Sequence, residues 1–286
     1  MSAAQNGAKP YYFVPQPSHW PVTGSCALLL MGSGAAVWVN SYPAGPWMVA
    51  AGFAVLVFMM FGWFGTVIGE SERRVFSKKV DLSFRWGMSW FIFSEVMFFA
   101  AFFGALFYIR NLSVPDLGSL TSKLLWPDYT YSWPTVGPYI KEQFTPMAAI
   151  GIPLLNTIIL LTSGVTLTIA HHALKAGNRG GLKLWLFLTI VLGFLFIGFQ
   201  AYEYSHAYSE MNLKLTTGVY GSTFFMLTGF HGAHVTIGAI MLTVMLFRVF
   251  RGHFDAEHHF AFEAAAWYWH FVDVVWLLLF VLVYWL

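Results

Sequence analysis

The sequence predicts an all-α membrane protein that crosses the bilayer with seven helices. Of its 286 residues, 58% are hydrophobic and only 10% are charged, whereas about 25% are charged in an ordinary soluble protein. Apolar runs of about 20 residues, which is the length of one helical crossing, recur along the chain. Their hydrophobicity is continuous and does not alternate in segments of about 10 residues, so they predict helices and not the strands of a barrel.

Seven apolar segments define the predicted transmembrane spans. They are Gly24–Asn40, Trp47–Ile68, Trp86–Ile109, Met147–Leu174, Leu184–Tyr204, Val219–Phe247 and Phe260–Trp285. The short "SYPAGP" turn joins the first two spans, and a charged segment separates that pair from the other five. We therefore expect an N-terminal segment and two-helix bundle at 1–69, a cytoplasmic linker at 70–85, and a five-helix bundle at 86–286.

Two features of these elements bear on contacts outside a single helix. The second span contains Gly65 and Gly69 at GxxxG spacing, which permits close helix packing, although glycine is frequent in membrane helices generally. The long loop at 110–146 is rich in Pro, Trp and Tyr, as in "WPDYTYSWPTVGPYI". Amphipathic aromatic residues settle at membrane interfaces, so this loop is expected to lie against the outer interface.

The single cysteine, Cys26, excludes a disulfide within the chain.

The distribution of Lys and Arg predicts the orientation, because cytoplasmic loops carry an excess of these residues. One side holds Lys9, Arg73, Arg74, Lys78, Lys79, Arg85, Lys175, Arg179, Lys183, Arg248 and Arg251. The other side holds only Arg110, Lys123, Lys141 and Lys214. The N-terminus is therefore expected to face the cytoplasm, or a matrix, and the C-terminus the outside. The N-terminal stretch lacks the features of a signal peptide, so the first span is expected to direct its own insertion.

A single carboxylate stands in the apolar stretch "FIFSEVMFF" of the third span. At helical spacing, the neighbours of Glu95 are two phenylalanines, an isoleucine and a third phenylalanine, none of which can pair with it. Burying an unpaired carboxylate is costly enough that such a group neutralises or finds a partner. We therefore expect Glu95 to be uncharged or hydrogen-bonded to another helix.

Two further polar pairs lie at i, i+3 spacing inside spans. His231 and His234 occur in "GFHGAHV", and His270 and Asp273 occur in "WYWHFVDVVW". Facing helices that carry carboxylates and histidines at this spacing build di-metal sites in some bundles. However, these pairs match no specific metal motif. The favoured interpretation is a structural hydrogen-bond network or lipid-facing groove, with a proton path, a metal site and a bis-histidine haem as alternatives.

The depths of these groups along their helices are similar. At 1.5 Å per residue, Glu95 lies about 15 Å from Arg85, and His234 lies about 21 Å from Arg248. The polar pair of the seventh span falls at a comparable depth, so we expect one buried polar layer. Its predicted members are Glu95, His231, His234, His270 and Asp273.

Other polar residues are expected nearer the two membrane surfaces. Gln200 and Glu203, in "GFQAYEY", map toward the outer interface, where water could solvate them. Five histidines lie at the basic cytoplasmic ends, where contact with lipid headgroups or a partner is favoured over catalysis. They are His171, His172, His253, His258 and His259.

Taken together, long stretches of the chain resemble subunit III of the haem-copper cytochrome c oxidases. The resemblance runs nearly from end to end and in order. It is carried by "PSHWPVTG", "RWGMSWFIFSEVMFF", "PLLNTIILLTSGVTLTIAHH", "GVYGSTFFMLTGFHGAHVTIG" and "HHFAFEAAAWYWHFVDVVWL". These motifs fall on the predicted spans and are far more specific than any short pattern.

The resemblance implies a fold and a role. It implies seven helices in two bundles, two and five, with a phospholipid-filled cleft between them. It implies that this chain has no catalytic residue and binds no haem or copper, while haem A and copper belong to partner subunits. The subunit would contact catalytic subunit I, share the complex with subunit II, support proton uptake and protect the complex during turnover, with cytochrome c as electron donor. Glu95 matches the family's buried glutamate.

One stretch differs from the family pattern. At "WFGTVIGE", Gly65, Thr66 and Gly69 stand where the family usually has charged residues linked to lipid headgroups. The remaining candidates for headgroup contact are Trp63, Arg85, Arg248, Arg251 and His253. The long outer loop and the absence of a targeting segment favour the inner membrane of a bacterium.

Two other functions compete with this interpretation. Subunit III of a quinol oxidase resembles the last five helices but usually lacks the first two, which are present here. A stand-alone proton or ion transporter could use Glu95, His234 and Asp273. The chain shows neither the internal repeat nor the broken helices typical of transporters.

Overall fold

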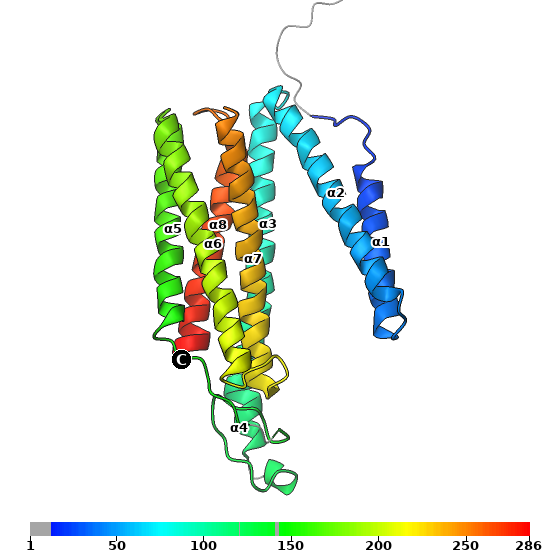
Figure 1. The fold of residues 1–286 in the computed structure, drawn as a ribbon, viewed down its shortest axis with the longest axis vertical. Helices are drawn as coiled ribbons and strands as arrows, with labels where there is room; N and C mark the ends of the chain where they lie inside the picture. Colours follow the sequence, from blue (N-terminus) through cyan, green and yellow to red (C-terminus); the bar gives the residue numbers. More distant parts are fainter. Residues whose placement is uncertain (1–12, 120, 141–142) are drawn as a thin grey trace, which may run out of the picture. The chain divides into compact units, whose positions relative to one another are not determined.

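The computed structural model describes residues 13–119, 121–140 and 143–286, and its regular secondary structure is entirely helical (Figure 1). The α-helices are α1 (Trp20–Val39), α2 (Gly45–Glu72), α3 (Lys78–Tyr108), α4 (Val114–Leu117), α5 (Ile152–Lys175), α6 (Arg179–Ser209), α7 (Gly218–Phe250) and α8 (Phe260–Leu279). Seven helical segments in this part of the chain are long and apolar enough to cross a membrane. The predicted fold class is therefore confirmed.

The helices extend beyond the apolar segments at several ends. Most of the expected linker at 70–85 is helical, because α2 continues to Glu72 and α3 begins at Lys78. Ser77 favours this early start, since its hydroxyl accepts a hydrogen bond from the Val80 N–H at 3.4 Å. The Asp81–Arg85 ion pair at 3.0 Å then supports the first turns. Polar residues of this kind end an apolar run without ending a helix.

The loop at 110–146 also differs from its prediction. Its first residues continue α3 through a π-helical turn, Ile109–Ser113, into α4. In contrast, Met147–Gly151 was expected to open the fourth span and is not helical. Gly151 has φ of 130°, a conformation that suits glycine and directly precedes α5.

The described chain forms two compact units, and their boundary lies between Trp86 and Gly87, inside α3. The grouping of two spans against five, and the lipid-filled cleft expected between them, stay predictions. Residues 1–12, including Lys9, and Lys141 in the outer loop lie outside the described residues.

In the first unit, α1 and α2 form a tight helical hairpin. Small residues allow the close approach: a Cβ at Gly34 would lie 2.8 Å from Met48 Cβ, and one at Gly52 would lie 2.7 Å from Met31 Cγ. By contrast, a Cβ at Gly65 or Gly69 would meet nothing within 4 Å. The GxxxG pair therefore takes no part in this hairpin.

In the second unit, α5, α6, α7 and α8 pack around Trp269. This side chain is fully buried, and its indole N–H donates to Ser163 Oγ on α5 at 2.9 Å. A Cβ at Gly193 on α6 would lie 2.6 Å from the ring, and one at Gly238 on α7 would lie 2.9 Å from it. The large ring thus fills the space that two glycines leave open.

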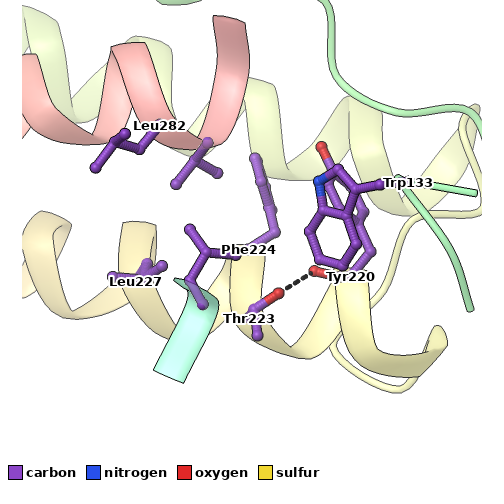
Figure 2. A pocket seen from close by; sticks show the side chains of 8 residues that line it. Trp133, Tyr220, Thr223, Phe224, Leu227 and Leu282 are labelled. Atoms are coloured by element: carbon purple, nitrogen blue, oxygen red, sulfur yellow. Dashed lines mark hydrogen bonds between the residues drawn. The ribbon is translucent and has the colours of Figure 1, made fainter. Parts of the chain in front are cut away.

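The loop at 110–146 packs against the start of α7. The Tyr220 N–H donates to Thr135 O at 3.2 Å, and the rings of Trp133 and Tyr220 lie 5.7 Å apart. Figure 2 shows Trp133 beside Tyr220, at the edge of a small pocket whose other labelled side chains include Phe224, Leu227 and Leu282. The loop is therefore fixed to the protein, while its contact with a membrane interface stays a prediction.

The packing of Trp269 can be tested with two alanine substitutions on one helix. Gly193→Ala should lower the stability of the detergent-solubilised chain by about 1–3 kcal/mol, because the new methyl group overlaps the indole ring. The control, Gly198→Ala, adds a methyl group that meets nothing within 4 Å. The midpoint of thermal unfolding should fall for the first variant only. Equal midpoints would contradict this account of the core.

Candidate functional site

Glu95 on α3 contacts His234 on α7. Glu95 Oε2 and His234 Nε2 lie 2.8 Å apart, and the two side chains are 21% and 14% exposed, respectively. The expected partner on another helix is therefore present, and it comes from 139 residues further along the chain. This contact links the first helix of the second unit to α7.

The other nitrogen of His234 determines how many protons the contact holds. His234 Nδ1 lies 2.6 Å from Phe230 O, and a carbonyl oxygen can only accept, so Nδ1 carries a hydrogen. Nε2 and the carboxylate must then share one proton. Either a neutral Glu95 donates to Nε2, or a cationic His234 donates to the carboxylate. The pair carries no net charge in either form, which is the least costly arrangement within a bilayer.

Aromatic rings surround this contact. The His234 ring lies 5.8 Å from the Phe98 ring, 5.0 Å from the Phe99 ring and 6.4 Å from the Tyr268 ring. Phe98 and Phe99 follow Glu95 by three and four residues, so helical spacing places them on the same side of α3. By limiting contact with water, these rings lower the local dielectric and strengthen the hydrogen bond.

His231 connects α7 to α8. Its side chain is fully buried, and Nε2 donates to Val272 O at 3.1 Å. The aromatic rings of Phe196 and Trp276 lie 5.8 Å and 5.2 Å from its ring. His231 therefore acts here as a buried helix-to-helix contact.

His270 and Asp273 pair with each other on α8, with Nδ1 and Oδ2 3.5 Å apart. The pair faces α5, where His270 Nε2 lies 3.4 Å from Thr168 Oγ1 and Asp273 approaches Gly164. No hydrogen bond within the described ranges joins it to Glu95–His234. The predicted members of the polar layer are thus placed as two separate pairs plus His231.

The structure also tests whether these groups converge as metal ligands. Across residues 13–119, 121–140 and 143–286, no three His, Cys, Asp or Glu side chains come together as a set that could hold a metal ion. The histidines and carboxylates make separate contacts instead of converging: His234 contacts Glu95, His231 contacts the Val272 carbonyl, and His270 contacts Asp273.

Sequence reasoning misplaced Gln200 and Glu203. Both were expected near water at the outer interface, but Gln200 is 5% exposed and Glu203 is 0% exposed. The Tyr284 hydroxyl, on the π-helical end of the last span, donates to Glu203 Oε1 at 2.7 Å. The depth along α6 did not reveal which way the side chains face. Their i, i+3 spacing, the same as in the two recognised pairs, was the available signal.

The expected headgroup contacts fall into two sets. Trp63 and Arg85 belong to the first unit, where Trp63 is exposed and Arg85 pairs with Asp81. In the second unit, the Arg248 guanidinium lies 4.4 Å from the Phe254 ring centroid, and its Nε donates to His253 Nδ1 at 3.4 Å. Arg248 is buried, whereas Arg251 is exposed.

The loop between α7 and α8 is held by Asp255. Slight burial raises the pKa of this carboxyl, but hydrogen bonds from the backbone N–H groups of His258 and Glu257 outweigh it, so the pKa lies below its usual value. His259 donates from Nδ1 to the Asp255 carbonyl at 3.1 Å and is buried. His259 is therefore not the surface histidine that was expected.

Comparisons with known proteins cover nearly the whole chain. The family model of cytochrome c oxidase subunit III matches residues 9–286. The chain belongs to the cytochrome c oxidase subunit III family. It is 43% identical over 275 residues to cytochrome c oxidase subunit 3 of the rabbit Oryctolagus cuniculus, with 96% of each chain covered. It is also 44% identical to the subunits of the goldfish Carassius auratus, over 96% of each chain, and the catshark Scyliorhinus canicula, over 97% of each chain.

The shared proton at Glu95 predicts a difference between two substitutions. Glu95→Gln should assemble normally and change the initial electron-transfer rate only modestly, because a glutamine amide can donate to His234 Nε2. Glu95→Leu should lower stability by about 1–3 kcal/mol, because it leaves Nε2 without a partner. Yield of intact oxidase, thermal stability and initial oxygen uptake measure these effects.

Glu210→Gln provides the matched control, because Glu210 is exposed and directly follows the last residue of α6. It should behave like the unsubstituted protein in all three measurements. If assembled Glu95→Gln oxidase lost most of its initial electron-transfer activity, Glu95 would have a more direct role than the contact suggests.

Proposed function

We propose that this chain is the non-redox membrane subunit of a proton-pumping cytochrome c oxidase, where it supports proton uptake into catalytic subunit I and its stability during turnover. The observation that carries the proposal is the Glu95–His234 contact, which holds one exchangeable proton between two spanning helices. Such a pair can hold or exchange a proton without leaving a bare charge in the bilayer.

The arrangement of ligating side chains supports a role without a metal centre of its own. His231 bonds to a backbone carbonyl, His234 bonds to Glu95, and His270 bonds within its own helix turn and to α5. We assign haem A and copper to the partner subunits, with cytochrome c as the electron donor to the complex and subunit II as a further member.

Apolar side chains that face outward from α3 suit contact with a membrane protein or with lipid. Trp90, Phe93 and Met97 are exposed in this chain and lie around Glu95 in sequence. Residues of this kind at a membrane depth meet acyl chains or the helices of a neighbouring subunit. We assign subunit I as the direct partner.

We further propose phospholipid binding at the cytoplasmic ends of the spans. Arginine binds phosphate groups through paired N–H donors, and Arg251 is exposed beside Arg248 and His253. In the first unit, Arg85 offers the same guanidinium group, and Trp63 offers a single indole N–H donor. The loop bias of Lys and Arg supports an N-terminus on the cytoplasmic or matrix side. We assign the chain to a bacterial inner membrane.

The quinol oxidase alternative is not favoured, because the matched relatives are named cytochrome c oxidase subunit 3 and their similarity includes the first two spans. Among the residues that the structure describes, no broken spanning helix supports the transporter alternative, and the sequence shows no internal repeat.

Purification through a tag on this chain tests the proposal directly. In mild detergent, the eluate should show the visible absorption of haem A and should consume oxygen when reduced cytochrome c is supplied. Oxygen uptake with a quinol but not with cytochrome c would favour the quinol oxidase alternative. A monodisperse eluate without haem absorption, from cells that express their terminal oxidase, would instead favour the transporter alternative.

The metal assignment has a separate test. The chain purified away from its partners should contain no copper or iron above background, because its described histidines and carboxylates do not converge. Elemental analysis checks this, with intact oxidase as the positive control. Stoichiometric metal in the isolated chain would overturn the assignment.

A further inference from the structure

His270 is a polar side chain on the outer surface of the second unit. It lies near the middle of the last span, Phe260–Trp285, and its side chain is 43% exposed. At this depth an exposed side chain faces acyl chains or another protein. Ionisable residues inside a membrane almost always face a protein interior or a cavity, because hydrocarbon offers them no hydrogen bond. The outward position of His270 therefore needs an explanation from outside the chain.

The contacts of His270 within the described chain leave much of its hydrogen-bonding capacity unused. Its Nε2 lies 3.4 Å from Thr168 Oγ1 on α5, in an exposed contact, and its Nδ1 lies 3.5 Å from Asp273 Oδ2. Typical N–H···O hydrogen bonds are about 2.9–3.0 Å long. The ring can therefore form a shorter bond with a further group on its exposed side.

The Thr168 hydroxyl determines which ring nitrogen carries a hydrogen. It donates its only hydrogen to the Gly164 carbonyl at 2.9 Å, so toward His270 it can only accept. Nε2 therefore carries a hydrogen. Nδ1 then shares one proton with Asp273, either as a cationic histidine beside a carboxylate or as a neutral histidine that accepts from a carboxylic acid.

The burial of Asp273 favours the neutral form. Asp273 is 7% exposed, and its Oδ1 is buried without a hydrogen-bond partner in the described chain. A charged oxygen in that position is costly, whereas the carbonyl oxygen of a carboxylic acid is far less so. Gly164 permits this placement, because a Cβ there would overlap Asp273 Oδ2. His270 is thus left as a neutral ring with an N–H donor at Nε2.

Apolar side chains extend this surface along both helices. The helices α5 and α8 are joined by the Trp269–Ser163 and Trp276–Thr157 hydrogen bonds. Four exposed side chains share a helix face with Thr168 or His270, since they lie three, four or seven residues away. They are Leu161 and Val165 on α5, and Val274 and Leu277 on α8. The result is an apolar helical face with one N–H donor near its middle.

We infer that this face of α5 and α8 binds a transmembrane helix of a neighbouring subunit, which presents a hydrogen-bond acceptor to His270 Nε2. A side-chain oxygen of Ser, Thr, Asn or Gln fits, because such groups form hydrogen bonds between membrane helices. Acyl chains have no acceptor, and lipid headgroups lie at the ends of the span. The inference rests on the proposed function only for the presence of neighbouring membrane subunits, and it assigns no role in proton uptake.

Photo-cross-linking of the intact oxidase tests the occupant of this face. Benzoylphenylalanine in place of Val165 should form an adduct with another membrane subunit, identified by mass spectrometry. The matched control places it at Val191, an exposed valine on α6, at a depth set by the Thr166–Thr189 hydrogen bond. A Val165 yield no higher than this control, or adducts with lipid alone, would overturn the inference. Haem A absorption shows that the complex is present, so that outcome would leave the proposed function intact.

Two substitutions test the hydrogen bond itself. His270→Gln keeps an acceptor for Asp273 and an N–H donor for the neighbouring helix, whereas His270→Phe keeps a ring and loses both. After a wash in stronger detergent, the Phe variant should retain about three- to tenfold less of the cross-linked subunit than the Gln variant. Quantitative mass spectrometry measures the retained fraction against unsubstituted oxidase. Equal retention in the two variants, whether high or low, would reject the hydrogen bond.

Discussion

Polar groups within a membrane need partners inside the protein, and this requirement organises the second unit. Trp269 donates to Ser163, Trp276 donates to Thr157, and Thr166 bonds with Thr189. Each of these contacts joins α5 to α8 or α6, so together they fix the register of three helices. Hydrophobic attraction cannot do this alone, because lipid tails are as apolar as the helix surfaces. Close packing of the Trp269 ring against Gly193 and Gly238 brings α6 and α7 to the same helices.

The number of spanning helices could be predicted from the sequence, because each segment that crosses the hydrocarbon core must be apolar over about 20 residues. The ends followed less well, because helix formation continues into polar residues that hydropathy excludes, as at Ser77 and Asp81. The prediction that Met147–Gly151 is helical was wrong for the opposite reason. It is apolar, yet the left-handed backbone of Gly151 delays the start of α5.

The candidate site shows what a single sequence can and cannot specify. Depth follows from counting residues, so Glu95 and His234 could be placed at similar levels before their contact was known. The direction of a side chain depends on which helix faces it, and periodicity does not name that helix. The same limit explains why His270 and Asp273 face α5 instead of Glu95. It also explains why Glu203 is enclosed by a tyrosine from the last turns of the chain.

Glu95 and Glu203 are both carboxyl groups within spanning helices, and their neighbours give them different chemistry. Glu95 meets a histidine nitrogen whose opposite nitrogen is already committed as a donor, so one proton lies between an acid and a base. That proton can move across the contact without changing the net charge. Glu203 meets a hydroxyl donor and no base, so losing its proton would leave an uncompensated charge. The first group is therefore suited to proton exchange, whereas the second is suited to holding its proton and organising the polar groups around it.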